Sequence, residues 1–438
     1  MSFLHSCSCE SVRTELDIFA LKTTQTSVEN SSYFEYKPVS ALTQGGNIEF
    51  YVNGGGDEYL DLSSSFINIT AQIYATVAID EANQAHQAVW NRVGPVNNFL
   101  SSLFASLDVS INQKTISSNS NTYAYRAYLE NLLNYDKEAK SSYLSSVLWA
   151  DDTPEAFDDT ANLNQGLVKR RTLIGGEKTV QLKGRIHADI FNQDKLLING
   201  CDVKLKFTPS RLGFAIMDPT GVCDVRILEA TLLVRRVKIN PSILLAHSNL
   251  LSKATAKYPL TKVEIKTVSL QQGSHGEFLD NLILGQLPKR VILGFVLSGA
   301  FNGSRTLNPF NFQNFNINYL CLHSGGQQYP NKPLQPDFAR NHFVDAYHTL
   351  FTDTCSNLTN QSNGISRDQY KDGNCLFCFD LSADSSASDN THWNLIRNGN
   401  LRIEVRFSEP LAQPVNLILY AEFDAMLELT SNRECIID

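Results

Sequence analysis

One series of segments occurs twice in this chain, about 200 residues apart, and such an internal repeat predicts two structurally equivalent domains. The second copy spans residues 307–351 and the first spans residues 96–135. In each copy, an Asn/Phe-rich segment precedes an apolar strand, a polar loop and an aromatic amphipathic helix. The repeat therefore favours two tandem domains over a single enzyme core.

The composition favours strands over helices. The chain has 438 residues, for which we expect two domains of roughly 100 to 200 residues each. Only 19% of the residues are charged, whereas the 24 Phe and 16 Tyr suit pleated sheets, on which aromatic side chains pack well. The sequence thus predicts an all-β protein with a few helices.

The first half has the pattern of a series of strands with two helical inserts. Apolar residues alternate through residues 48–52 and 59–77 on either side of a Gly-rich turn, which predicts a β-hairpin with a long second strand. A helix is predicted at residues 123–134, with Thr122 as its N-cap, and a shorter one at residues 95–105. Further strands are predicted at residues 107–113, 178–190, 195–208 and 225–239.

The second half repeats this order after a connecting helix at residues 242–253, which Pro241 opens. A helix is predicted at residues 337–353 with Asp337 as its N-cap. The polar residues 354–373 are predicted to form a long projecting loop. Strands are predicted at residues 262–271, 277–284, 290–297, 316–323, 374–381, 400–407 and 415–430.

The expected fold is an all-β double jelly roll, in which two tandem eight-stranded antiparallel β-sandwiches carry short helical inserts. We assign residues 1–36 to an N-terminal arm, residues 37–250 to the first jelly-roll domain, and residues 251–438 to the second domain with its C-terminal tail. Terminal arms become ordered only when they dock. We therefore expect the tail after Ser431 to contact a neighbouring molecule or to be disordered. We expect the arm to contact a neighbour or its own domain through Leu16, Ile18, Phe19 and Leu21.

The charge pattern argues against a nucleic-acid-binding surface. The net charge is −8, and attraction to nucleic acid over a whole surface relies on clustered Lys and Arg. Two basic spots, residues 169–171 and 235–236, are interpreted as solvated ends of strands or loops, although the first could touch an acidic neighbour. Because no stretch has the pattern of a signal peptide or approaches the roughly 18 apolar residues of a membrane span, we expect neither.

The cysteines are interpreted as reduced thiols. There are nine of them, an odd number without the paired spacing of a disulfide scaffold. Cys375 and Cys378 lack a second such pair, and in a strand they would face opposite sides. Cys7 and Cys9 have only His5 nearby. Neither group predicts a zinc site.

Other candidate metal ligands also have the wrong spacing. His342, Asp345 and His348 share a predicted helix, but the two histidines are six residues apart, whereas a HExxH zinc site needs four. We interpret them as the polar face of a helix at a subunit contact. The acidic pairs at residues 151–152 and 158–159 lack the EF-hand spacing and are interpreted as a solvated loop.

No motif predicts catalysis. The glycine runs at residues 54–56 and 175–176 are interpreted as turns, and the chain contains no GxSxG elbow. We therefore assign no catalytic, cofactor-binding or metal-binding residue and expect the chain not to be an enzyme. Two β domains with little chemistry favour a protein that assembles through polar-rimmed interfaces.

Two other classes stay open at this point. One alternative is a tandem β-sandwich that binds carbohydrate or acts as an adhesin, since jelly rolls also serve lectins. A chain that stays monomeric at all protein and salt concentrations would favour it over an assembling protein. A weaker alternative is a cupin-type enzyme, which would bind a metal.

Four segments resemble the major capsid protein of Polinton (Maverick) elements and adintoviruses. They are residues 3–29, 37–73, 308–330 (NPFNFQNFNINYLCLHSGGQQYP) and 419–438, and the resemblance extends over nearly the whole chain. It implies a double jelly roll that provides two upright β-sandwiches per chain. Three chains would then form a pseudo-hexagonal capsomer that tiles an icosahedral shell around double-stranded DNA.

The resemblance also implies partners and a location. The partners would be the two other chains of a homotrimer, neighbouring capsomers, and penton and minor capsid proteins, with only indirect contact to the encapsidated DNA. The protein would belong to the virion, assembled inside the host cell. No cofactor is implied.

Overall fold

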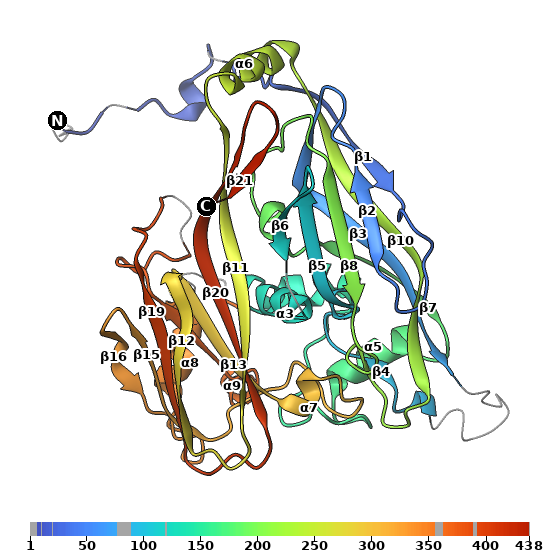
Figure 1. The fold of residues 1–438 in the computed structure, drawn as a ribbon, viewed down its shortest axis with the longest axis vertical. Coiled ribbons are helices and arrows are strands. Elements are labelled where there is room, and N and C mark those ends of the chain that lie inside the picture. Colours follow the sequence, from blue (N-terminus) through green and yellow to red (C-terminus); the bar gives the residue numbers. More distant parts are fainter. Residues whose placement is uncertain are drawn as a thin grey trace.

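The computed structural model of the chain describes residues 7–9, 11–19, 21–76, 89–118, 121–354, 362–388 and 392–437. Two β-sandwiches lie side by side and are joined by helix α6 (Pro241–Leu251) (Figure 1). Helix α6 lies at the end of the molecule from which the N-terminal arm extends (Figure 1). The strands of the first sandwich lie within residues 28–239, and those of the second within residues 256–437.

The first sandwich has eight main strands, all of them paired antiparallel. In chain order they are β1 (Val28–Tyr36), β2 (Ile48–Val52), β3 (Glu58–Ala75), β5 (Phe104–Ile111), β6 (Lys114–Ser118), β7 (Thr179–Arg185), β8 (Val203–Pro209) and β10 (Cys223–Ile239). One sheet has the order β1-β10-β3-β7 and the other has the order β2-β8-β5-β6.

The second sandwich repeats this topology. Its strands are β11 (Ala256–Leu270), β12 (Gly276–Gln286), β13 (Arg290–Leu297), β15 (Ile317–Ser324), β16 (Gln327–Leu334), β18 (Leu376–Asp380), β19 (Asn398–Phe407) and β20 (Val415–Leu429). The sheets have the orders β11-β20-β13-β18 and β12-β19-β15-β16, so the first strand pairs with the last in both sandwiches. The two predicted eight-stranded antiparallel sandwiches are confirmed.

Short helices and two-residue strands lie mostly in the long connections. Between β3 and β5 lie β4 (Gly94–Pro95) and α2 (Phe99–Ser102); between β6 and β7 lie α3 (Tyr123–Asn134), α4 (Lys137–Ser141) and α5 (Gln165–Ile174). The second sandwich has α7 (Ser298–Phe301), β14 (Phe312–Gln313), α8 (Val344–Thr352), α9 (Arg367–Lys371) and β17 (Asp372–Gly373). The remaining elements are β9 (Ile216–Met217), β21 (Cys435–Ile437) and the 3-10 helices η1 (Thr14–Leu16), η2 (Tyr143–Val147) and η3 (Asp189–Phe191).

Alternate residues of the facing sheets fill each core. In the first sandwich, Ile67 and Ile69 of β3 point toward the sheet that contains Leu205 and Phe207 of β8, and all four are buried. Burial of each such apolar side chain stabilises the fold by about 1.5–3 kcal/mol. This alternation is the pattern from which the strands were predicted.

The sequence repeat corresponds to equivalent structural elements. Strands β5 and β6 lead into α3 in the first sandwich, and β15 and β16 lead into α8 in the second. In both sandwiches the two strands occupy the same edge of the same sheet. The equivalence predicted for residues 96–135 and 307–351 is confirmed.

The predicted hairpin of β2 and β3 is wrong. The two strands belong to opposite sheets, where β2 pairs with β8 and β3 pairs with β10 and β7. The Gly-rich turn between them is held against the segment before β8, because the Gly54 N–H donates to Asp202 Oδ1 at 2.9 Å. A Cβ atom on Gly54 would lie 2.1 Å from the Cys201 carbonyl oxygen, so the chain crosses between the sheets where only glycine fits.

The helix predicted at residues 337–353 begins later, at Val344. Asp337 does not cap it; its side chain accepts the Arg340 N–H at 2.9 Å, and its backbone forms a bridge with His342. Thr122 precedes α3 as predicted, but its side chain makes no capping hydrogen bond. Strand β16 was not predicted.

The loop predicted at residues 354–373 does not project over its described part. Residues 355–361 lie outside the described residues, but Asn363, Ile365 and Tyr370 are buried and residues 367–371 form α9. The segment from Asn363 onward therefore packs on its own sandwich.

The predicted arm and tail also contain strands. Residues 28–36, assigned to the arm, form β1 and pair with β10. In the tail, β21 pairs with β20, and the Arg433 side chain donates to the Asn199 carbonyl of the first sandwich at 2.7 Å. The tail thus docks on its own chain, and its expected contact with a neighbour stays a prediction.

Candidate functional site: the seam between the sandwiches

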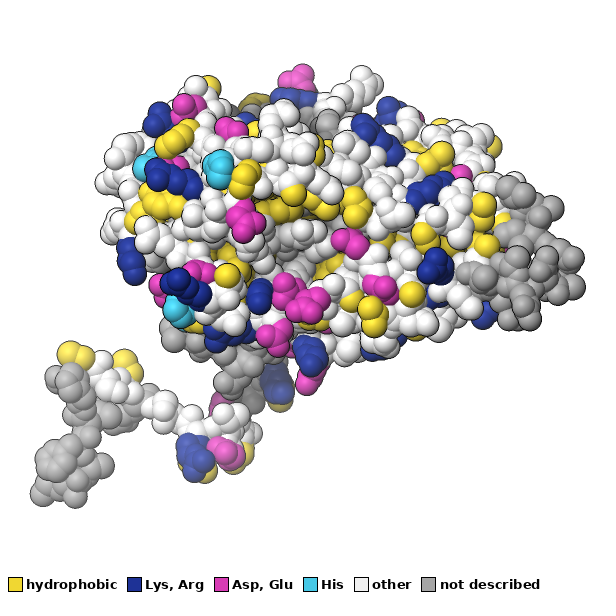
Figure 2. All heavy atoms as spheres, turned by 90° about the horizontal axis from the view of Figure 1, so that it is seen from below, with side chains coloured by type: hydrophobic (Ala, Val, Ile, Leu, Met, Phe, Trp, Pro, Cys, Tyr) yellow, Lys and Arg dark blue, Asp and Glu magenta, His cyan; other side chains and the backbone are white. Residues whose placement is uncertain are grey.

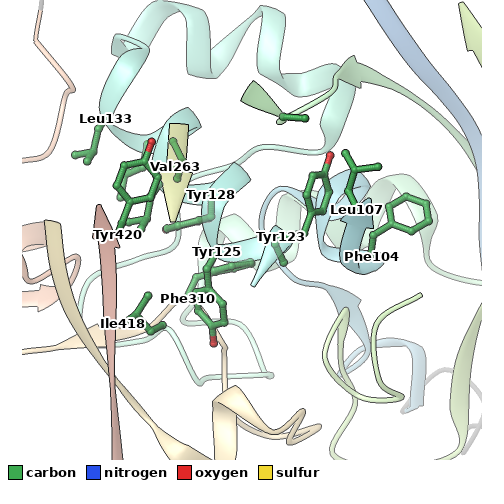
Figure 3. Packing of buried hydrophobic residues seen from close by; sticks show 14 of the residues in the cluster. Phe104, Leu107, Tyr123, Tyr125, Tyr128, Leu133, Val263, Phe310, Ile418 and Tyr420 are labelled. Carbon is green, nitrogen blue, oxygen red and sulfur yellow. The ribbon is translucent and has the colours of Figure 1, made fainter. Parts of the chain in front are cut away.

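The seam is the surface along which the first sandwich packs on the second, and α3 lies at its centre. Every residue of α3 except Asn134 is buried. On the other side of the seam, β20 is buried on both faces over residues 415–423. Ile418 and Tyr420 of β20 lie on the face that turns away from the second core and toward α3 (Figure 3).

Stacked aromatic rings fill the middle of the seam. The rings of Tyr128 on α3 and Phe310 of the second sandwich are parallel within 3°, with centroids 4.1 Å apart (Figure 3). Trp149 stacks on Tyr128 at 5.2 Å, and Tyr125 meets Phe310 edge-on at 5.7 Å. Such pairs contribute about 0.5–1.5 kcal/mol each beyond the area they bury, so the seam is a joint core.

Tyr125 places a buried polar group in the seam. The Tyr125 hydroxyl is buried and has no hydrogen-bond partner among the described residues. Because an unpaired buried hydroxyl costs about 1–3 kcal/mol, Tyr125→Phe is expected to keep or raise the free energy of unfolding. The control is Tyr420→Phe, which removes a hydroxyl that donates to Glu422 at 3.1 Å and is expected to destabilise. Urea denaturation measures the free energy of unfolding of both variants. A larger decrease for Tyr125→Phe than for Tyr420→Phe would contradict this expectation.

A buried ion network crosses the seam. Arg126 Nε lies 2.8 Å from Glu130 Oε1, and an Arg126 terminal nitrogen lies 2.7 Å from Asp189 Oδ1. Asp189 also accepts the backbone N–H of Val263 in β11 at 3.2 Å. Burial opposes the ionisation of Glu130, but Arg126 and the hydrogen bond from His187 outweigh it and lower the pKa of Glu130 to about 2.

A second polar cluster joins the connection before β15 to the first sandwich. Arg170 lies 2.6 Å from Asp152 Oδ1, and the Asn308 amide donates to Asp152 Oδ2 at 3.1 Å. Asp158 accepts the Asn308 N–H at 2.6 Å and the Asn311 side-chain amide at 2.8 Å. These bonds fix the segment that carries Phe310.

These contacts correct three interpretations made from the sequence. Asp152 is buried and paired rather than part of a solvated loop. Arg170 and Arg171 are buried on α5, so residues 169–171 are not a solvated basic spot. Residues 235–236 lie within β10, where Arg235 pairs with Asp61 and Arg236 with Glu58. The signal for the seam that sequence reasoning missed is a charged pair at i and i+4, Arg126 and Glu130, in an otherwise apolar helix.

The other candidate ligands do not form a site. Asp345 and His348 are exposed on α8, and His342 precedes the helix. Over the described part of the chain, no three His, Cys, Asp or Glu side chains gather as metal ligands would. Cys375 and Cys378 are buried, and burial raises the pKa of both thiols far above the usual range. Thiols of this kind are poor nucleophiles and poor metal ligands.

Two large hollows border the seam. A polar cleft of about 790 Å³ lies between the sandwiches. Several charged side chains in its lining are paired, among them Lys289, 2.8 Å from Asp424, and Arg290, 2.6 Å from Glu422. Seen from the end opposite α6, apolar side chains gather along the middle of the molecule (Figure 2). The second hollow, about 990 Å³, lies beneath α6 and has a mainly apolar lining.

Comparisons with solved structures agree with this geometry. A chain of the Sputnik virophage, solved by cryo-EM, superposes with a TM-score of 0.65 at 15% identity, over 99% of this chain and 93% of that chain. A chain of the PBCV-1 virus capsid superposes with a TM-score of 0.60 at 10% identity, over 96% of this chain and 98% of that chain. The mavirus major capsid protein superposes with a TM-score of 0.54 at 11% identity, over 100% of this chain and 97% of that chain. The fold is a double jelly roll.

Sequence comparisons add one relative. An uncharacterized protein of Caenorhabditis elegans is 29% identical over 432 residues, which span 95% of this chain and 99% of that protein. No family model matches the chain. None of the helices in the described ranges is both long enough and apolar enough to span a membrane.

Two surfaces of the molecule correspond to the two sides of the seam but are not covered within the chain. They are helix α8 and the outer face of the sheet that contains β3 and β10. Helix α8 is equivalent to α3, but only Ala346 and Leu350 of α8 are buried, and Val344 is 48% exposed. The outer face of the sheet with β3 and β10 is equivalent to the face of β20 that α3 covers. On it, Tyr33 is 53% exposed and its ring lies 6.3 Å from that of half-buried Phe66.

Proposed function

We propose that this chain is a major capsid protein, the structural building block of the icosahedral shell of a double-stranded DNA virus or virus-like transposon. The observation that carries the proposal is the repeated jelly roll, in which the helical side of one sandwich packs on the outer sheet face of the next. Both halves of this contact recur, uncovered, on the opposite flanks of the molecule. A surface that can repeat its own internal contact favours a closed ring of copies.

The proposed ring is a homotrimer. If α8 of one chain packs on the outer face of β3 and β10 of the next, as α3 packs on β20 within a chain, each new contact has the geometry of the seam. Two sandwiches per chain then give six similar units in a three-fold ring. Such closure would cover the sheet face that carries Tyr33 and Phe66, which a soluble monomer would leave in water.

The finer assignments belong to the same proposal. The resemblance of residues 37–73 and 308–330 to Polinton and adintovirus capsid proteins supports a place in that lineage. We infer that neighbouring capsomers, penton proteins and minor capsid proteins are its partners, and that it resides in the virion after assembly inside the host cell. We further propose that it has no enzymatic activity, and that strand β1 begins the first of two jelly-roll domains that meet near residue 250.

The test is the mass of the purified chain in solution, measured by light scattering. We expect a trimer of about 146 kDa, three times the 48.8 kDa of one chain. Val344→Asp places a carboxylate in the proposed contact and is expected to weaken association at least about ten-fold, since 1.4 kcal/mol already gives that factor. The control is Leu163→Asp, at an exposed residue in the connection before α5.

Circular dichroism should show that both variants are folded. A trimer that tolerates Val344→Asp would contradict the proposed contact. A chain that remains a 48.8 kDa monomer at all protein concentrations would contradict the proposed function.

A further inference from the structure

The hollow beneath α6 is an apolar groove with an open side. Helix α6 stands over it without a single buried residue, and Leu244, Leu245 and Leu251 contribute to the lining. Its opposite wall includes Tyr59 and Ile198. At about 990 Å³, the groove is at the upper end of the roughly 300–1,000 Å³ range of protein binding pockets.

Helix α6 is held above the groove rather than packed into it. The Tyr59 hydroxyl lies 2.9 Å from His247 Nδ1, and the two rings stack with centroids 5.9 Å apart. This contact connects α6 to β3 of the first sandwich. Leu245 and Leu250 remain more than half exposed on α6, which is costly for a helix that has no further partner.

The N-terminal arm carries unpartnered apolar side chains at the same end of the molecule. Phe19 is 95% exposed and Leu21 is 96% exposed, and the arm stands away from the body (Figures 1 and 2). Val12, Leu16 and Phe19 follow the i, i+4, i+7 spacing of a helix that binds in a groove. Residues 14–16 already form a 3-10 turn at the centre of this stretch.

We propose that residues 12–21 of a second copy of this chain bind in the groove beneath α6 as an amphipathic helix, with Val12, Leu16 and Phe19 facing the apolar lining. The inference rests on the proposed assembly, because it needs a neighbouring copy. It adds an exchange of arms that ties copies together through a surface distinct from α8 and the outer sheet face.

Charge complementarity supports the binding of residues 12–21 in the groove. The groove is lined by Lys195, Lys257 and Arg433, with Asp57 as its one carboxylate. The arm segment carries Glu15 and Asp17 against a single Arg13. An apolar stripe flanked by acidic residues thus faces an apolar floor with a basic rim.

The direction in which the arm runs favours binding in the groove of a neighbouring copy over binding in its own groove. The arm leaves the body next to α6, where the Asn240 N–H donates to the Ser27 carbonyl at 3.0 Å. From that point its described residues run outward, and residues 11–19 are all exposed. An arm that starts beside one groove and points away from it is placed to reach the groove of an adjacent copy.

The test is site-directed disulfide formation in the full-length protein. One version of the chain carries Leu16→Cys in the middle of the arm, and a second version, longer by a tag, carries Ser248→Cys in the groove lining. Both carry Cys7→Ser and Cys9→Ser, so that the introduced thiol is the only cysteine within the described part of the arm. Leu244→Cys is a second groove position, in case Ser248→Cys fails to trap the arm.

The two versions are co-expressed, purified together and oxidised. We expect a shift to a covalent species of two unequal chains on a non-reducing gel, lost on reduction. The matched control replaces the groove cysteine with Leu163→Cys, which is exposed but lies away from α6, and should give no shift. A version with both cysteines in one chain tests binding of the arm to its own groove.

The outcomes separate this inference from the proposed function. A trimer by light scattering that forms no bond between chains with either groove cysteine overturns the arm exchange alone. A disulfide that forms only within the doubly substituted chain would show that the arm binds its own groove. It would contradict the binding of a second copy's arm. A monomer that forms no bond between chains contradicts both the exchange and the proposed assembly.

Discussion

Phe310→Ala is expected to lower the free energy of unfolding by about 3–5 kcal/mol, the range for removing a large buried aromatic side chain. Phe310 belongs to the second sandwich, but its ring is fully buried against Tyr128 and Tyr125 of the first. The segment before it is fixed by buried hydrogen bonds to Asp152 and Asp158, so the chain has little freedom to close the cavity. The loss should therefore fall at the upper end of this range.

Urea denaturation followed by tryptophan fluorescence measures this effect, because Trp149 stacks on Tyr128 and so reports on the seam. The matched control is Phe278→Ala on β12, where the side chain is 60% exposed and the change should stay within about 0.5 kcal/mol. If Phe310→Ala destabilises no more than the control does, the seam is not a joint core.

Arg126→Met is expected to cost about 3–5 kcal/mol, because it leaves two buried carboxylates without their cation. Methionine keeps most of the length of the side chain, so the loss reports charge rather than packing. Glu130 and Asp189 would then lie together without a cation between them, and the pKa of Glu130, now held at about 2, should rise. Adding Glu130→Gln and Asp189→Asn should recover part of the loss.

The control for this prediction is Arg402→Met. Arg402 pairs with Asp280, but both side chains are about half exposed, and such surface pairs contribute about 0–1 kcal/mol. Equal losses for Arg126→Met and Arg402→Met would contradict the importance of the buried network.

The sequence predicts the long jelly-roll strands well. Residues 225–239 and 415–430 were predicted nearly at the bounds of β10 and β20, because both strands are long and rich in β-branched and aliphatic residues. Strands β1 and β16, both at a sheet edge, escaped prediction. Residues 28–36 are rich in Asn, Ser and Glu, and β16 contains Pro330 and Pro333, which an edge strand tolerates.

The seam could not be predicted from the sequence because it depends on a partner far along the chain. Helices α3 and α8 have similar apolar stripes, yet α3 is buried almost all round and α8 is not. What differs is the neighbour: the second sandwich covers α3, while α8 lies on the flank of the molecule. For the same reason the burial of Arg170 and Asp152 could not be predicted from the sequence, where charged residues indicate solvent.

Electron microscopy of the purified full-length protein is the most direct test of the proposed trimer. We expect particles with six similar lobes around a three-fold axis, in which each chain contributes two adjacent sandwiches and α8 lies against the outer face of β3 and β10 of the next chain. Particles with only two lobes at every protein concentration, or rings closed through other surfaces, would contradict it.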